Sequence, residues 1–408
     1  MDPVVLGIFI LVYVSMIFGR LPGLALDRTG VVLVGAIAIV ATERLSSKQA
    51  WDSIDIPTIG MLFGLMIVSA QFSSAGFYGR ITTRLSALQV GDRTLLLVVI
   101  MVTGVLSALL TNDIVVFAMT PVLVAGCAHR ALDPLPFLLG QMCAANIGSA
   151  ATLIGNPQVI FIGQRFGLGF NAYLLDSLVP VLLSMAVIWL VICIVMRGSW
   201  DTGAVGGDEA EPPTYLPYQA FKGVLALAAI VLIYIFTHWP REVVALAVAA
   251  LLLMSRTQQS RRTLDMVDWQ LLLMFIGLFI VNHAMEATGT LGILLKWLGG
   301  LGVNLDNAAA LYVTTAVASN LVSNVPAVIL LANASQSELA GPILAISSTL
   351  AGNLLLVGSL SNIIVLGQAD RLGVKITWAE HAKVGLPVGL ISLLIAAAWL
   401  WLRFTWMA

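Results

Sequence analysis

Long apolar runs alternate with short polar segments along this chain. In the first half, the apolar runs lie at about 4–20, 30–44, 57–76, 94–128, 135–164 and 174–196. A helix that spans a bilayer needs about 20 residues, most of them apolar. The pattern therefore predicts membrane-crossing helices. The amphipathic segment 81–90 interrupts it, and we expect that segment to lie at the membrane interface.

The run at 94–128 is interrupted near its centre by Thr111, Asn112 and Asp113. Each apolar arm covers about fifteen residues, which is too few to cross a bilayer comfortably. The pattern predicts a re-entrant helical hairpin, because a polar turn at membrane depth must be buried in protein or line a wet cavity. An aspartate at that depth costs roughly 2.5–3.5 kcal/mol. We therefore interpret Asp113 as a functional residue.

The two halves of the chain repeat one another. The segment 52–64 aligns with 265–277 without a gap, and the pair Thr111-Asn112 recurs as Ser323-Asn324. Several such matches in the same order indicate a duplication. Residues 198–216 between the halves are polar, acidic and contain Pro and Gly, which is typical of a linker.

The duplication predicts two repeat units, 1–197 and 217–408. We expect a hairpin in each, at about 94–128 and 304–336, and a broken helix in each, at about 135–164 and 340–369. Pro157 lacks a backbone donor and disfavours helix at Asn156, so one break has a local cause. The residues that we place at the two breaks are Gly148, Ser149, Gly155, Asn156, Gly358, Ser359, Ser361 and Asn362.

Composition narrows the class of protein. The chain is 59% hydrophobic and 10% charged, with a mean hydropathy of +0.99, which excludes a soluble domain of this size. The net charge of −1 predicts no nucleic-acid partner. The sequence has no G-x-x-x-x-G-K-[ST] motif for ATP, and its apolar runs hold no nucleophile–base pair or metal cluster, so we expect no enzyme. Three isolated cysteines, Cys127, Cys143 and Cys193, are interpreted as packing residues.

The basic residues predict the orientation of the chain. If each hairpin returns to its own side and each half has five crossings, the halves are inverted. The linker face then carries fourteen of the Lys and Arg residues and the other face six. Basic residues gather on the cytoplasmic side, so the linker is expected inside and both termini outside, with the first hairpin opening to the cytoplasm and the second outward. The predicted fold is an all-α polytopic membrane protein with about ten crossings and broken helices at the midplane, an architecture typical of secondary transporters.

The motifs at the hairpins and breaks resemble those of the ion transporter superfamily. The resemblance rests on Asn112-Asp113, on segment 145–158 (ANIGSAATLIGNPQ), and on segments 323–326 (SNVP) and 358–362 (GSLSN). It is strongest to the branch of arsenite-efflux proteins and sodium–proton antiporters, which includes silicic acid exporters. Sodium-coupled dicarboxylate symporters are more distant. The resemblance implies a scaffold and a mobile transport domain, an elevator motion, and a homodimer in the plasma membrane.

One departure from the symporter branch bears on the substrate. That branch has Ser-Asn-Thr at both hairpin tips, whereas this chain has Thr111-Asn112-Asp113 and Ser323-Asn324-Val325. The hydroxyl and amide positions match, but the third position does not. Asp113 would repel a carboxylate unless it were protonated or neutralised by a cation.

Residue types suggest roles at the site, because hydroxyl, amide and freed carbonyl oxygens bind solutes and Na⁺. We assign substrate binding to Thr111, Asn112, Asn156, Ser323, Asn324, Ser361 and Asn362. Ion coupling is assigned to Asp113, Gly148, Ser149, Gly155, Gly358 and Ser359, with a possible Na⁺ site at Thr111, Asn112, Asp113 and Asn324. The alternatives are helix capping at the first tip, a kink without ligands at Pro157, and interhelical hydrogen bonds at Asn324 and Asn362. His283 and Glu286 fit a relay, a gate or a water-facing pair. Asp55 and Asp268 begin their apolar spans, and we expect them to cap those helices.

Together these features predict an ion-coupled secondary transporter without a cofactor other than its coupling ion, H⁺ or Na⁺. The expected solute is a small oxyacid or its anion, such as arsenite or silicic acid, which is exported in exchange for that ion. Sodium-coupled symport of a carboxylate or inorganic anion is the first alternative, and a sodium/proton antiporter is the second. A channel is an alternative of another class, because hairpins also build pores.

Overall fold

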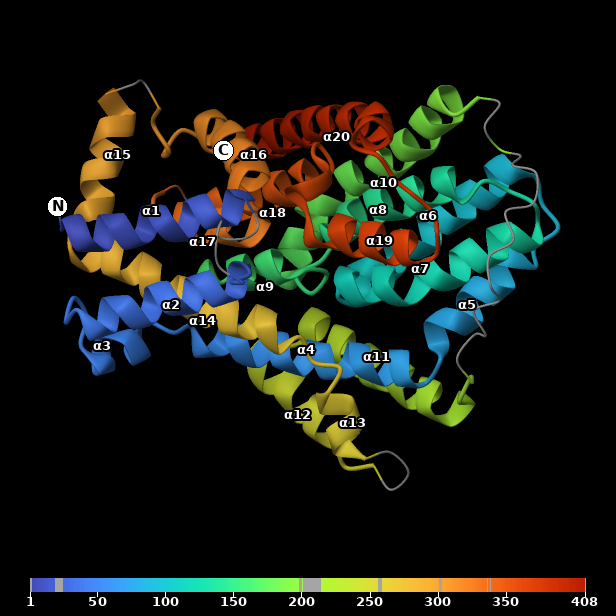
Figure 1. Ribbon diagram of the computed structural model, residues 1–408, viewed down its shortest axis with the longest axis horizontal. Helices are drawn as coiled ribbons and strands as arrows, with labels where there is room; N and C mark the ends of the chain where they lie inside the picture. The colour runs from blue at the N-terminus through green and yellow to red at the C-terminus, as the bar shows by residue number, and fades with distance from the viewer. Residues whose placement is uncertain are drawn as a thin grey trace.

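The computed structural model describes residues 2–407, apart from 19–24, 198–199, 201–213, 256–258, 301–302, 336 and 338. In this part of the chain the regular elements are helices, and no strand occurs (Figure 1). Seven of these helices are long and apolar enough to cross a membrane, and four shorter ones are also apolar. The predicted all-α polytopic fold is confirmed. Most of the predicted linker lies outside the described residues.

The helices follow one another in the same order in both halves. The first half contains α1 (Pro3–Phe18), α2 (Arg28–Ala41), α3 (Ser47–Asp52), α4 (Ile56–Ser74), α5 (Phe77–Ser86), α6 (Asp92–Leu109), α7 (Asn112–His129), α8 (Pro134–Ser149), α9 (Pro157–Arg165) and α10 (Phe170–Val195). The second half contains α11 (Pro217–Phe236), α12 (Arg241–Leu253), α13 (Ser260–Leu264), α14 (Trp269–Ala287), α15 (Thr290–Gly300), α16 (Ala308–Val322), α17 (Asn324–Ala332), α18 (Ala340–Ala351), the 3₁₀ turn η1 (Leu356–Gly358), α19 (Leu360–Arg371) and α20 (Trp378–Met407).

Helices α4 and α14 are equivalent in the two halves, and each crosses a helix of the other half. Helix α4 packs on α12, and α14 packs on α2. A Cβ added at Gly64 of α4 would lie 2.7 Å from the backbone carbonyl carbon of Ala245. One added at Gly277 of α14 would lie 2.6 Å from Cγ1 of Val32. The two glycines that align in the sequence repeat therefore permit the same close crossing twice.

The equivalent helices run in opposite directions. Asp55, which precedes α4, lines the same cavity as Glu286 at the end of α14. The start of one helix thus lies beside the end of its counterpart, as expected for inverted repeats. Both helices begin in the same way, because Asp55 accepts a hydrogen bond from Thr58 N (3.0 Å) and Asp268 from Leu271 N (2.9 Å). The capping role of both aspartates is confirmed.

The first hairpin consists of α6 and α7, which have 18 residues each. These arms are longer than the sequence pattern suggested, and by length and composition each is able to span a membrane. The second hairpin is shorter, with 15 residues in α16 and 9 in α17. The arms of the first hairpin are thus not too short to span. Its tip is nevertheless tied into the protein interior by contacts of α7 with α19 and α8.

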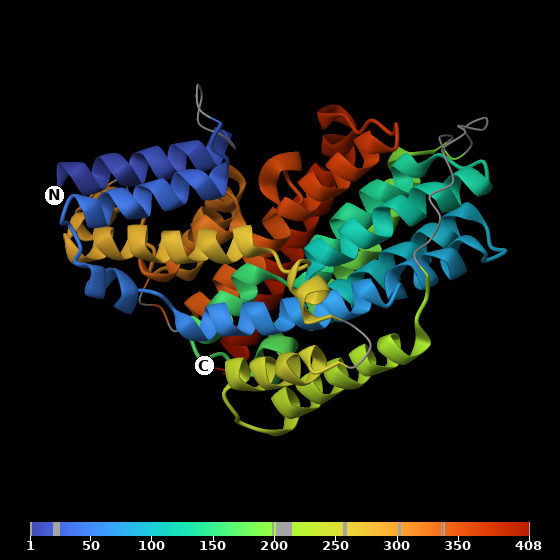
Figure 2. The same cartoon turned by 60° about the horizontal axis from the view of Figure 1, so that its bottom comes forward.

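The helices near the hairpin tips fall into two groups by their packing, and Figure 2 shows their arrangement from a second direction. We call α1, α2, α4, α11, α12 and α14 the frame, because they pack on one another through the two crossings described above. We call α7, α8, α9, α17, α18 and α19 the tip body. In it α7 packs on α19 and α17 packs on α9, so each hairpin contacts the broken helix of the other half.

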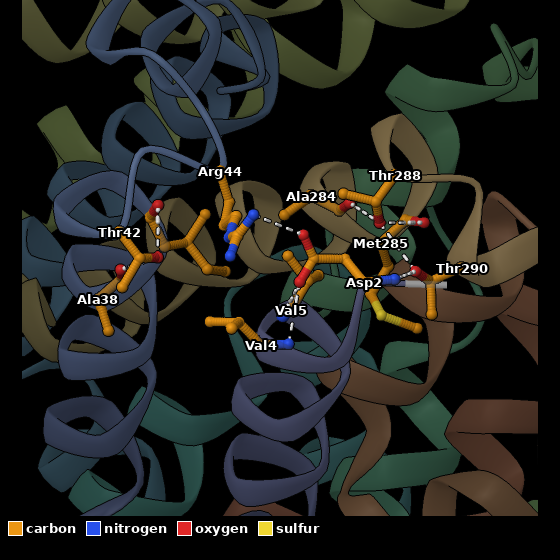
Figure 3. Close-up of polar contacts among 11 residues, drawn as sticks. Asp2, Val4, Val5, Ala38, Thr42, Arg44, Ala284, Met285, Thr288 and Thr290 are labelled. Atoms are coloured by element: carbon orange, nitrogen blue, oxygen red, sulfur yellow. Dashed lines mark hydrogen bonds and ion pairs between the residues drawn. The ribbon is translucent and has the colours of Figure 1, made fainter.

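The amino-terminal residues are tied to the frame through Asp2 (Figure 3). Its carboxylate accepts hydrogen bonds from Val4 N and Val5 N and lies 3.1 Å from Nη1 of Arg44. Its backbone N donates to Thr290 Oγ1 at 3.4 Å. These contacts join the start of α1 to the end of α2 and the start of α15.

Candidate functional site

The tip of the first hairpin is fixed by contacts with two other helical elements. Thr111 Oγ1 lies 3.2 Å from Ser69 Oγ of α4, and Asn112 N donates to the carbonyl of Gly155 at 3.2 Å. Thr111 makes no side-chain capping bond to α7. Its hydroxyl therefore anchors the tip to the frame, and the alternative that it merely caps the helix is not supported.

Asp113 links the first hairpin to the second half of the chain. Ser361 Oγ of α19 donates to Asp113 Oδ1 at 2.6 Å, so two residues predicted for the site are in direct contact. Among the described residues, no Lys, Arg or His forms an ion pair with Asp113. A lone carboxylate in this position is available to a proton or a cation.

The tip of the second hairpin contains a strained residue. Ser323 has φ 75° and ψ 158°, a conformation that is essentially restricted to glycine. With its amide oriented to suit its neighbours, Asn324 donates to the carbonyls of Gly358 (3.0 Å) and Ser348 (3.2 Å) and accepts from Gln158 Nε2 (3.3 Å). The two tips are thus held alike, since Asn112 N donates to Gly155 and Asn324 Nδ2 donates to Gly358.

Asn156 and Asn362 lie in a buried polar network. Asn156 Oδ1 accepts from Val159 N (2.9 Å), and its Nδ2 donates to Ser149 Oγ (2.9 Å) and Thr349 Oγ1 (3.3 Å). Asn362 Oδ1 accepts from Asn146 Nδ2 at 3.0 Å. Both predicted binding residues are fully buried. They join the broken helices to each other rather than facing open space.

The same network crosses between the halves at a second point. Asn146 Oδ1 accepts from Ser359 Oγ (2.7 Å), and Asn146 Nδ2 donates to Asn353 Oδ1 (2.8 Å). Ser359 precedes α19 as Asn156 precedes α9, so each half-helix begins with a residue that bonds to the incoming half-helix of the other repeat. Asn146 and Asn353 were not singled out from the sequence. Their signal was an amide inside an apolar run.

Three glycines predicted for ion coupling have a packing role in this structure. A Cβ at Gly148 would lie 2.3 Å from the carbonyl oxygen of Gly104, and one at Gly155 would lie 2.3 Å from that of Ser149. A Cβ at Gly358 would lie 2.7 Å from Asn320 Oδ1. Each glycine therefore permits a close approach of polar or backbone groups.

A cavity of about 540 Å³ lies where the tips and the breaks meet. Its size is within the range of small-molecule sites. Of the predicted residues, those that line it are Asn112, Asp113, Ser323, Asn324 and Ser359. Those that do not are Thr111, Gly148, Ser149, Gly155, Asn156, Gly358, Ser361 and Asn362. Sequence reasoning missed Asp27, Arg28, Gln158 and Gln270 as lining residues and gave Asp268 only a capping role.

Four helix N-termini converge on this cavity, namely those of α7, α9, α17 and α19, whose first residues Asn112, Pro157, Asn324 and Leu360 line it. Such termini carry a partial positive charge and unpaired N–H groups, so they favour electron-rich oxygen atoms. The frame side adds Asp27, Arg28 and Asp268. The two aspartates cap their own helices, α2 and α14. Asp113 is therefore the carboxylate of the cavity that does not cap a helix.

Asn112 presents an acceptor without a partner. Its side chain is 5% exposed and lines the cavity, yet no described residue donates a hydrogen bond to its Oδ1. An unsatisfied buried acceptor costs about 1–3 kcal/mol. A solute that donates a hydrogen bond, or a cation, would remove that cost.

The sequence was compared with known families and proteins. Residues 13–342 match the CitMHS family, which is described as citrate transporter. The chain is 27% identical to the silicon efflux transporter LSI3 of Oryza sativa subsp. japonica, over 96% of this chain and 95% of that protein. It is 28% identical to the inner membrane protein YbiR of Escherichia coli K12, over 82% and 85% of the two chains.

The fold was also compared with solved structures. It resembles the crystal structure of the YdaH transporter of Alcanivorax borkumensis, which was described as having an unusual topology. The TM-score is 0.57, with 14% sequence identity and 99% of each chain covered. The likeness therefore extends over nearly the whole of both chains.

Proposed function

Because the chain belongs to the CitMHS citrate transporter family and is a multi-pass membrane transporter, we propose that it exports a small oxyacid in exchange for H⁺ or Na⁺. Silicic acid and arsenite are the first candidate solutes. The silicon efflux activity named for a relative at 27% identity supports this class of solute. The observation that carries the proposal is the cavity at the two hairpin tips, with its unpartnered acceptor on Asn112.

The chemistry of the cavity suits an uncharged acid with several hydroxyl groups. Asn112 Oδ1 and Asp113 accept hydrogen bonds, so they favour hydroxyl donors on the solute. The four helix N-termini favour the solute's oxygen atoms. A hydroxylated oxyacid offers both kinds of group on one small molecule. Free citrate carries several negative charges and would meet Asp27, Asp113 and Asp268 around the same cavity.

Coupling is assigned to Asp113. A carboxylate at the tip of a hairpin holds either a proton or Na⁺, and the occupant changes the charge that the solute meets. The bond from Ser361 joins Asp113 to the second half, so a change at Asp113 reaches both repeats. We further propose that the tip body moves relative to the frame, as in an elevator. Each hairpin packs on the broken helix of the other half, and this packing supports motion of the tip body as one unit.

The test is solute flux from proteoliposomes. Vesicles are loaded with silicic acid or arsenite, and an inward proton gradient and an inward Na⁺ gradient are imposed separately. One of the two gradients should accelerate efflux. When that gradient is collapsed, the efflux rate should return to the rate measured without a gradient. If neither gradient changes the efflux of either oxyacid relative to protein-free vesicles, the proposal is wrong.

Sodium-coupled carboxylate symport is the second candidate, and two observations favour it. The family is described as citrate transporter, and Arg28 lines the cavity without an ion pair to any described acidic residue. Arg28 is the first residue of α2, where a cation is unfavourable because the helix N-terminus carries a partial positive charge. Its presence there is better explained by an anionic ligand than by the stability of α2. Na⁺-driven citrate uptake into the same vesicles, without oxyacid efflux, would favour this candidate.

A further inference from the structure

A second cavity, of about 250 Å³, lies at the opposite ends of the helices that form the first. Its lining includes Asp55 before α4, Arg165 at the end of α9, Asn333 after α17, and His283 and Glu286 near the end of α14. The proposed function does not use these residues. These side chains carry charges of both signs.

The two cavities are aligned along the same three helices. Helix α9 lines the first cavity with Gln158 and the second with Phe161, and α17 does so with Val325 and then Ile329. Helix α14 contributes Met274 to the first cavity and Phe279 to the second. Residues three to five positions apart are separated by roughly 5–8 Å along a helix axis. Little more than one helical turn therefore separates the cavities.

Aromatic rings on α9 and α14 line the second cavity directly beside that turn. The ring centroids of Phe161 and Phe279 are 5.6 Å apart, and Phe275 lies 5.9 Å from Phe279. Phe161 and Phe279 are 3% and 7% exposed. A hydroxylated solute that passed between these rings would lose its hydrogen bonds, which is costly in an apolar contact. The rings therefore separate two cavities whose linings each include charged and polar side chains.

We propose that the second cavity is the far-side stage of the solute path and that Phe161 and Phe279 form the barrier between the two stages. The nature of the solute, a small hydroxylated oxyacid, rests on the proposed function, whereas the path itself does not. Phe161 belongs to the tip body and Phe279 to the frame, so a displacement of one relative to the other separates the rings. The barrier thus lies at the surface that must slide.

A hydrogen-bonded contact beside the barrier holds the same surface together. Tyr13 Oη of α1 lies 3.0 Å from Asn282 Oδ1 of α14 and 3.3 Å from the carbonyl of Pro326 in α17, and its proton is shared between these acceptors. Tyr13 is 6% exposed. The contact joins the frame to the second hairpin between the two cavities, because Pro326 lines the first and Asn282 the second. It stabilises the closed arrangement of the barrier.

The barrier is tested by chemical access, which requires no knowledge of the solute. Val325→Cys places a thiol in the first cavity, and a small charged methanethiosulfonate reagent is applied from either side of sealed vesicles at 4 °C. The native cysteines are buried, so the protein without Val325→Cys measures background labelling. We expect fast labelling from the side of the first cavity alone. Adding Phe161→Ala or Phe279→Ala should raise labelling from the other side at least tenfold.

Phe275→Ala is the matched control, because Phe275 contacts Phe279 but lines neither cavity. It should leave labelling from the far side unchanged. Equal far-side labelling with and without the Phe161 and Phe279 substitutions, in variants that keep the wild-type Tm, would overturn the barrier. So would a Phe275→Ala variant that admits reagent as fast as they do. Failure of oxyacid flux with the expected labelling pattern would refute the solute and leave the path intact.

Discussion

At the residue scale, the two polar positions of the first hairpin tip have different surroundings. Asp113 accepts a hydrogen bond from Ser361, whereas Asn112 Oδ1 has no described donor. The first is thus held in place with one oxygen engaged, and the second is buried beside the cavity without a partner. We therefore expect Asp113 to decide ion dependence and Asn112 to decide solute affinity.

Asp113→Asn should fold, because an amide keeps the shape of the carboxylate and still accepts from Ser361. It should lose the dependence of solute flux on the H⁺ or Na⁺ gradient, since an amide neither binds a proton in this range nor carries charge. The measurement is flux in proteoliposomes with each gradient imposed alone. Transport against a solute gradient with unchanged ion dependence would mean that the coupling site lies elsewhere.

Asn112→Leu should weaken solute binding by about tenfold, because one hydrogen bond to the solute is worth roughly 1–1.5 kcal/mol. The protein's Tm should change little, since the wild-type acceptor makes no bond to lose. Binding is measured by titration of the purified protein with silicic acid or arsenite. Asn156→Leu is the control, and it should lower Tm because Asn156 bonds to Val159, Ser149 and Thr349.

At the element scale, the broken helices depend on close approach. Helix α8 contacts α6 closely, and Gly148 lies against the backbone of Gly104. In membranes, small residues allow helices to approach and pack through van der Waals contact. Gly155 lies equally close to the carbonyl oxygen of Ser149, whose hydroxyl bonds to Asn156 in the polar network. The glycines therefore shape the site although none of those predicted for ion coupling lines the cavity.

Gly148→Ala should destabilise the protein by about 1–3 kcal/mol, because the new Cβ would overlap the Gly104 carbonyl and force the helices apart. Gly367→Ala is the matched control. It lies in α19, where an added Cβ meets nothing within 4 Å, and alanine favours helix by up to about 1 kcal/mol. Thermal unfolding in detergent compares the two. A Gly148→Ala variant as stable as Gly367→Ala would contradict the close-packing role.

At the scale of the whole molecule, the two cavities lie on opposite sides of the tips. The first is bordered by the starts of α2 and α14, and the second by the start of α4 and the end of α14. The distribution of Lys and Arg residues predicts that the first side is cytoplasmic, because basic residues gather there. The structure fixes which residues share a side, and the assignment of the sides to cytoplasm and exterior stays a prediction.

Cysteine labelling tests this orientation with two exposed residues. Lys375→Cys, on the predicted cytoplasmic side, should react with an impermeant maleimide only after cells are opened. Lys48→Cys, on the predicted outer side, should react in intact cells. Each position is the other's control, because both side chains are exposed. The reverse pattern would invert the orientation and with it the proposed direction of export.

The sequence by itself determined the membrane class, the duplication and the identity of the two tips. Apolar runs have no other stable environment, and the aligned pairs Thr111-Asn112 and Ser323-Asn324 marked equivalent turns without structural information. It also showed where helices begin, because Asp55 and Asp268 are local caps and Pro157 is a local break. These features depend on a few neighbouring residues or on a repeated pattern.

Only the tertiary structure decided which polar residues face the cavity and which lie behind it. Asn156 and Asn362 are the same kind of residue as Asn112 and Asn324, yet they are buried in bonds to other helices. Arg28 lines the cavity, although the sequence of its helix did not predict a role at the site. The reason is physical: a hydrogen-bonding side chain serves a solute or another helix equally well. The choice is made by contacts between residues hundreds of positions apart, such as Asp113 and Ser361.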